Sequence, residues 1–73
     1  MLNRSHAGWR CRTRVHLETV EGPLPRGSGG TIWYEMDNLG RRLVFVQWDN
    51  GMRVPVFPHE IELQEQEADR WPL

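Results

Sequence analysis

The chain has 73 residues, which is enough for one domain, and its formal net charge of −1 lacks the basic excess typical of proteins that bind nucleic-acid phosphates. Its single cysteine, Cys11, excludes an internal disulfide and a Cys-x-x-Cys site. No apolar run reaches the roughly 20 residues that span a membrane, and the first residues lack the apolar stretch of a secretory signal, so we expect a cytoplasmic protein that does not enter a membrane.

The first part of the chain reads as an arm, a strand and a loop. Residues 1–8 are polar and are expected to form a flexible arm. From Trp9 to Leu17 the side chains alternate with the period of two that is typical of a half-buried strand. The face expected to point inward carries Trp9, Cys11, Thr13, Val15 and Leu17. Residues 18–30 contain two prolines and four glycines, which predicts a long loop.

The middle of the chain predicts a meander of three strands. Residues 31–36 are rich in β-branched and aromatic side chains, which are typical of a strand, and residues 37–40 form a turn. Residues 42–48 form the most clearly patterned strand, with three residues turned inward: Val44, Val46 and Trp48. Asp49-Asn50-Gly51 is a hairpin signal, and residues 52–57 form the return strand.

The end of the chain predicts one turn and one short strand. Pro55 lacks a backbone N–H, which places the return strand at an edge of the sheet. Residues 58–60 are expected to form a short 3₁₀ turn, and residues 61–63 a last strand. Residues 64–73 are acidic and polar and are expected to form a flexible tail.

Three motifs along these strands resemble those of a known protein family. Gly30-Thr31-Ile32 comes first, Val46-Gln47-Trp48-Asp49-Asn50-Gly51 follows, and Val56-Phe57-Pro58-His59-Glu60-Ile61 closes the series. Over residues 9–63 the chain resembles short bacterial proteins with an SH3-like barrel and a Val-x-Trp-Asp-x-Gly hairpin. The resemblance implies an all-β fold: a single five-stranded barrel with a long loop after strand one and a 3₁₀ turn before the last strand. Such barrels serve as accessory subunits, nucleic-acid-binding modules and peptide-binding domains, so the motifs specify a fold and no shared chemistry.

The outer face of the first strand carries three arginines, Arg10, Arg12 and Arg14, followed by His16. Alternate residues of a strand lie about 6–7 Å apart, a spacing comparable to that of adjacent phosphates on a nucleic-acid strand. In an SH3-like barrel, however, the last strand lies beside the first, where Glu60 and Glu62 could neutralise these arginines. The sequence leaves open whether the arginine face is free.

Two apolar residues are candidate partner contacts. The alternation of residues 31–36 turns Ile32 and Tyr34 inward and Trp33 outward. Trp33 is then either an exposed anchor for a partner or covered by the loop or by Trp71. The loop offers Leu24 and its flanking prolines as a further contact.

No catalytic, cofactor-binding or metal-binding residues are predicted. The three histidines are far apart, Cys11 falls on the inner face, and Gly27-Ser28-Gly29-Gly30 leads into a strand rather than a helix N-terminus. We expect a small non-enzymatic binding or accessory module that docks on a protein partner through Arg10, Arg12, Arg14, Leu24 and Trp33. The alternative is a weak nucleic-acid-binding barrel that uses the same arginine face.

Overall fold

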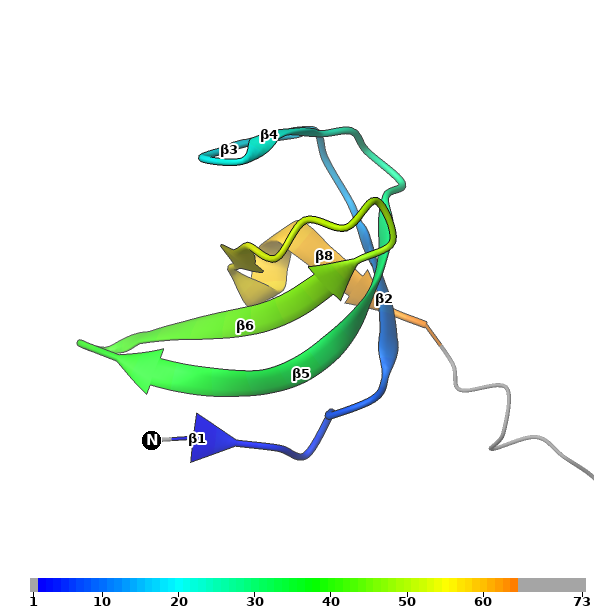
Figure 1. Ribbon diagram of the computed structural model, residues 1–73. Coiled ribbons are helices and arrows are strands. Elements are labelled where there is room, and N and C mark those ends of the chain that lie inside the picture. The colour runs from blue at the N-terminus through cyan, green and yellow to red at the C-terminus, as the bar shows by residue number, and fades with distance from the viewer. Residues whose placement is uncertain (1, 65–73) are drawn as a thin grey trace, which may run out of the picture.

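The computed structural model describes residues 2–64, which form an all-β fold without an α-helix (Figure 1). The strands are β1 (Leu2–Asn3), β2 (Arg10–Thr13), β3 (Leu17–Thr19), β4 (Gly22–Leu24), β5 (Gly29–Asn38), β6 (Arg41–Trp48), β7 (Pro55–Val56) and β8 (Ile61–Leu63). One 3₁₀ turn, η1 (Pro58–Glu60), precedes β8. The predicted acidic tail lies outside the described residues apart from Gln64.

The larger sheet has the antiparallel order β7-β6-β5-β2-β8, with β1 added to β5, and β3 and β4 form a separate two-stranded sheet. The five predicted strands correspond to β2, β5, β6, β7 and β8. Residues 2–64 therefore form eight strands rather than five, and their sheets are not closed into a barrel. The three additional strands arise in segments whose composition indicates an arm and a loop.

The N-terminal segment is attached to the sheet, in contrast to the predicted flexible arm. Leu2 and Asn3 of β1 pair with Met36 and Glu35 of β5. The turn that follows is anchored by the backbone N–H of Gly8, which donates to the carbonyl of Ile32 over 2.7 Å. This segment has no apolar alternation of its own, so its polar sequence conceals the pairing.

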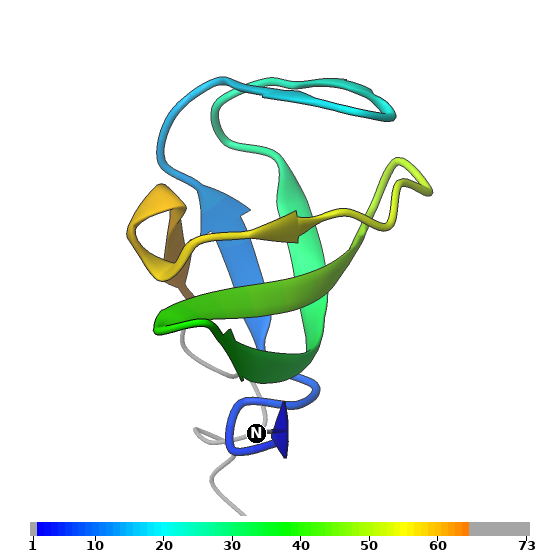
Figure 2. The same cartoon turned by 90° about the vertical axis from the view of Figure 1, so that its left-hand side faces the viewer.

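The predicted loop contains a hairpin, which Figure 2 shows at one end of the molecule, away from β1. Leu17 of β3 pairs with Leu24 of β4, and Gly22 turns the chain with a φ of +128°. Leu24 is completely buried, with 0% of its surface exposed. The expectation that Leu24 contacts a partner is therefore wrong, because the hairpin folds this side chain into the core.

Strands β5 and β6 form the long curved hairpin that dominates Figure 1. A register shift between Ile32 and Tyr34 marks a β-bulge, which inserts a residue and reverses the alternation beyond it. Ile32 faces the core as predicted, but beyond the bulge the buried side chain is Glu35 rather than Tyr34. Tyr34 instead stacks on Phe45, with ring centroids 4.7 Å apart.

The core lies between the sheet and the segments that fold across it. Its buried apolar residues are Cys11, Leu24, Ile32, Val44, Val46, Trp48, Val54, Val56 and Ile61. The predicted inward face of β6 is confirmed. The indole N–H of Trp48 donates to the carbonyl of Val54 over 3.1 Å, so the buried polar atom of this ring is satisfied. The turn after Trp48 closes as expected, with Gly51 at a φ of +95°.

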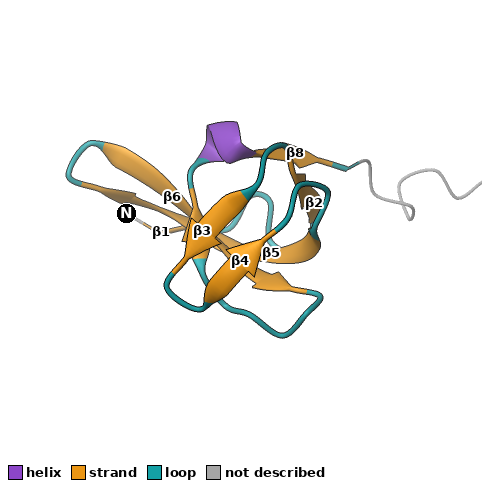
Figure 3. Ribbon diagram, turned by 90° about the horizontal axis from the view of Figure 1, so that it is seen from above, coloured by secondary structure: helices purple, strands orange, loops and turns teal. Residues whose placement is uncertain are grey.

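Strand β8 completes the sheet beside β2, as Figure 3 shows from above, with η1 leading into it. Pro55 lies in β7, at the edge of the sheet, as its missing N–H requires. Strand β2 is shorter than predicted, because it ends at Thr13, whose hydroxyl donates to the carbonyl of Pro25. Over residues 2–64 no helix is long and apolar enough to cross a membrane.

Candidate functional site

The charge of Arg10, on the predicted arginine face, is neutralised by a bidentate ion pair with Asp49. Its guanidinium donates to both carboxylate oxygens of Asp49, over 2.9 and 2.6 Å, and to the hydroxyl of Thr31 over 3.0 Å. The hydrogen bonds from Arg10 lower the pKa of the Asp49 carboxyl below its usual value. Asp49 thus belongs to the hairpin turn that the sequence predicts and also ties this turn to β2.

Arg12 and Arg14 instead converge with Arg26, which the sequence did not single out. With Thr13, Gly27 and Glu62 they line a polar cleft of about 540 Å³, which we call the arginine cleft. Nη2 of Arg12 lies 3.8 Å from a carboxylate oxygen of Glu62. Within the part of the chain that the structure describes, Arg14 and Arg26 form no ion pair.

Whether the arginine face is free, which the sequence leaves open, has a mixed answer among the described residues. Glu62 lies opposite Arg12 across the pairing of β2 with β8. Glu60 turns elsewhere, because its carboxylate accepts the backbone N–H of Phe57 over 2.9 Å and closes the 3₁₀ turn. His16 pairs with Glu18 over 2.6 Å at the start of the β3–β4 hairpin. Of the residues that the structure describes, Glu62 is the one acid that lines the cleft, where it faces three guanidinium groups.

Trp33 lies on the outer face of β5 and retains 46% of its surface exposed. The guanidinium carbon of Arg53 lies 5.4 Å from the centroid of its ring, within the range of a cation–π contact. Beside Trp33 is an open cleft of about 510 Å³, which we call the aromatic cleft. Its lining residues are Arg4, Ala7, Gly8, Thr31, Ile32, Trp33 and Tyr34.

The N-terminal turn and the β-bulge together create the aromatic cleft. The turn supplies Arg4, Ala7 and Gly8 as one wall, and the bulge adds Tyr34 to the wall formed by Trp33. Thr31 lines this cleft together with Trp33 and also accepts a hydrogen bond from Arg10. Two of the predicted contact residues, Arg10 and Trp33, therefore lie on either side of Thr31. Neither the turn nor the bulge has a clear sequence signal, which explains why this arrangement was missed.

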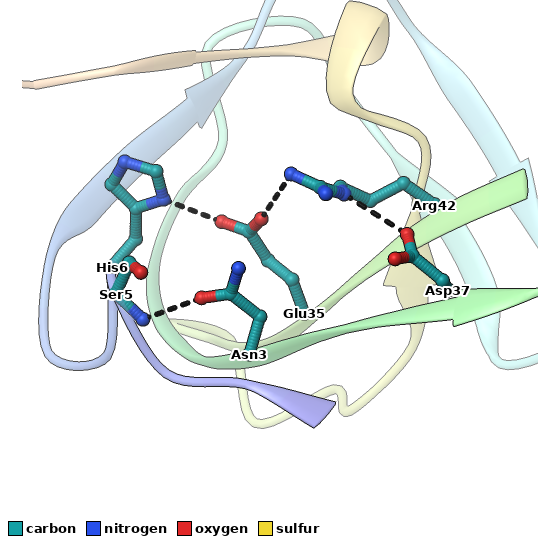
Figure 4. A network of polar contacts seen from close by, with 6 residues as sticks. All are labelled: Asn3, Ser5, His6, Glu35, Asp37 and Arg42. Carbon is teal, nitrogen blue, oxygen red and sulfur yellow. Dashed lines mark hydrogen bonds and ion pairs between the residues drawn. The ribbon is translucent and has the colours of Figure 1, made fainter. Parts of the chain in front are cut away.

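A buried carboxylate lies on the opposite, inner side of β5. Glu35 is 5% exposed and accepts hydrogen bonds from two side chains, as Figure 4 shows. Nδ1 of His6 donates to one carboxylate oxygen over 2.6 Å, and Nη1 of Arg42 donates to the other over 3.2 Å. Arg42 also donates to Asp37. This network fastens the N-terminal turn to the β5–β6 hairpin.

Cys11 is inert by its position in the core. It is completely buried, and burial raises the pKa of its thiol from the ordinary 9.0 to about 11. We expect its reaction with a disulfide reagent at pH 8 to be at least about 100-fold slower in the folded protein than in urea, because the thiolate fraction falls by about that factor and the buried sulfur is also shielded from the reagent.

The raised pKa of Cys11 makes the free energy of unfolding depend on pH. Because the folded pKa of Cys11 is raised, its contribution to stability is complete below about pH 9 and is lost as the pH rises toward 11. Urea unfolding between pH 8 and 11 measures this loss, and the Cys11→Ala variant should lack that part of the dependence. Equal slopes for both proteins would contradict the assignment.

No metal centre is formed among residues 2–64, where no group of three or more His, Cys, Asp or Glu side chains is placed to hold an ion. Comparison with protein-family models, curated proteins and solved structures found no significant match to this chain. The interpretation of its surfaces therefore depends on their own geometry and charge.

Proposed function

We propose that the chain is a small non-enzymatic module that docks on a protein partner, with Trp33 as the central anchor. The observation that carries the proposal is the half-exposed indole of Trp33, which lies against Arg53 and beside the open aromatic cleft. Tryptophan, tyrosine and arginine are the residue types most enriched at the energetic centres of protein interfaces. The aromatic cleft brings all three types together.

The strand order supports an SH3-like relationship for this module. A hairpin follows β2 where such barrels have their long loop, a 3₁₀ turn precedes β8, and β8 lies beside β2. We further propose a cytoplasmic location, because a small exported domain would normally be stabilised by disulfides and this chain has one cysteine.

Nucleic-acid binding is the weaker candidate. Arg10 is held by Asp49 and Arg12 lies near Glu62, so of the three predicted arginines Arg14 keeps its charge unpaired among the described residues. Arg26 adds one more, but the net charge of −1 gives no long-range attraction to phosphates.

The test is an affinity pull-down with the wild-type chain and two variants. Trp33→Ala removes the anchor, and Val20→Ala removes an apolar side chain that is 99% exposed on the β3–β4 turn. Proteins retained by the wild type should bind Trp33→Ala about tenfold or more weakly, because truncation of a central aromatic anchor typically costs this much or more. The same proteins should bind Val20→Ala unchanged.

Two outcomes would count against the proposal. Equal recovery by all three proteins would show that Trp33 is not the anchor. Salt-dependent amide shifts of Arg12 and Arg14 on titration with a single-stranded oligonucleotide, without a Trp33-dependent protein partner, would favour the nucleic-acid alternative.

A further inference from the structure

Among residues 2–64, the arginine cleft carries a positive charge that its own acidic residue does not balance. Its three guanidinium groups, from Arg12, Arg14 and Arg26, face one carboxylate, that of Glu62, so the charges in the cleft sum to +2. The rest of the chain must then be acidic, because the whole sequence has a net charge of −1. A local excess of this kind against the overall charge marks a surface selective for anionic groups.

The backbone around the cleft favours carboxylates over phosphates. Sites for free phosphate commonly use unpaired backbone N–H groups. Here the N–H of Thr13 donates to the backbone carbonyl of Ser28, and the N–H of Arg14 donates to that of Glu60. The N–H of Gly27 donates to the carbonyl of Thr13, that of Ser28 donates to the carbonyl of Pro25 and the hydroxyl of Thr13, and Pro25 has no N–H. The N–H of Arg26 makes no hydrogen bond among the described residues, so the guanidinium groups and this one N–H are the donors that an anion would meet.

The chain already shows how its arginines hold carboxylates. Arg10 binds Asp49 in a bidentate geometry, whereas Arg12 and Glu62 are 3.8 Å apart and both half-exposed. A planar guanidinium matches a planar carboxylate in the first geometry, and the second pair is weak. Glu62 is thus a resident carboxylate that a better-placed one could displace.

We propose that the arginine cleft binds an acidic segment of the protein partner, with at least two carboxylates seated against Arg12, Arg14 and Arg26. This inference rests on the proposed function and names the chemistry of the segment that would bind. The two net charges of the cleft require two carboxylates for balance, and its open volume of about 540 Å³ gives room for side chains of this size.

The test titrates the full chain with a blocked hexaglutamate peptide while the backbone amides are followed by NMR. Shifts should be confined to residues 12–14, 26–28 and 62, and should weaken as salt rises. Arg14→Gln and Arg26→Gln should each weaken binding about five-fold, the upper range for one exposed ion pair. Arg41→Gln, which removes the same charge beside Phe57, should leave binding unchanged.

Removal of the resident carboxylate gives the sharpest result. Glu62→Gln should tighten hexaglutamate binding about two- to five-fold, because it frees Arg12. Glu18→Gln, which changes the net charge equally but lies beside His16, should not. Equal effects of these two variants, or of Arg14→Gln and Arg41→Gln, would show a general charge effect and overturn the site.

Inorganic phosphate and a six-nucleotide oligothymidylate complete the titration. Tighter binding of either than of hexaglutamate would overturn the preference for carboxylates. The peptide titration does not involve Trp33, so it can fail while Trp33-dependent capture of a partner succeeds. The inference and the proposed function are thereby tested separately.

Discussion

Gly30→Ala is expected to destabilise the fold by about 2–3 kcal/mol, the upper part of the range for overpacking a tight core. A Cβ at this position would lie 2.5 Å from Cγ1 of Val46 and 2.7 Å from Cε3 of Trp48. It would also lie 3.1 Å from the backbone carbonyl of Gln47, which cannot move independently. For a domain of this size the melting temperature should fall by roughly 10–20 °C.

Gly29→Ala is the matched control for this prediction, because it adds the same methyl group one residue earlier. There the Cβ would meet the ends of two flexible side chains, Arg10 and Asp49, each at 3.0 Å. These side chains can move outward, so we expect a loss of less than about 1 kcal/mol. Thermal and urea unfolding of both variants measures the difference, and equal losses would mean that Gly30 is not packed against Trp48.

Arg42→Met should cost about 2 kcal/mol, because it leaves the buried carboxylate of Glu35 without its cation. This loss of stability is smaller than the loss expected on breaking a fully buried ion pair, because Arg42 is half-exposed. Asp37→Asn breaks the other ion pair of the same arginine, at an exposed site, and should cost less than about 1 kcal/mol. Urea unfolding of the two variants separates the buried pair from the exposed one.

A double variant tests the reason for this cost. Glu35→Met combined with Arg42→Met removes both charges and replaces them with apolar side chains. It should be more stable than Arg42→Met alone, because no carboxylate is left buried without a cation. If the double variant is the less stable of the two, then burial of the Glu35 charge is not what makes Arg42→Met costly.

Regular alternation and turn chemistry predicted the central part of the fold. The inward face of β6, the turn at Gly51, the edge position of Pro55 and the 3₁₀ turn at Pro58–Glu60 follow from local rules, and all are present. The bulge after Ile32 could not be predicted, because the sequence there continues to alternate while the pairing does not. That one residue placed Glu35 in the interior and left Tyr34 half-buried on the outer face of β5.

The candidate site was predicted in part, for a similar reason. Arg12 and Arg14 follow from the alternation of residues 9–17, but the partner of Arg10 lies 39 residues away in the hairpin turn. Arg26 reaches the cleft because β3 and β4 fold back, and Leu24 enters the core for the same reason. Contacts between distant segments of this kind have no local signature in the sequence.

The pairing of β2 with β8 has a consequence for the order of folding. The β5–β6 hairpin closes through a turn of two residues, Leu39 and Gly40, and can form locally. Cys11 and Leu63, by contrast, must meet across almost the whole described chain. Closing so long a loop costs chain entropy before the contacts between β2 and β8 can form. We therefore expect folding in milliseconds to seconds, with the β5–β6 hairpin formed early and β8 docked last. Amide exchange at β8 should then be faster than within β5 and β6.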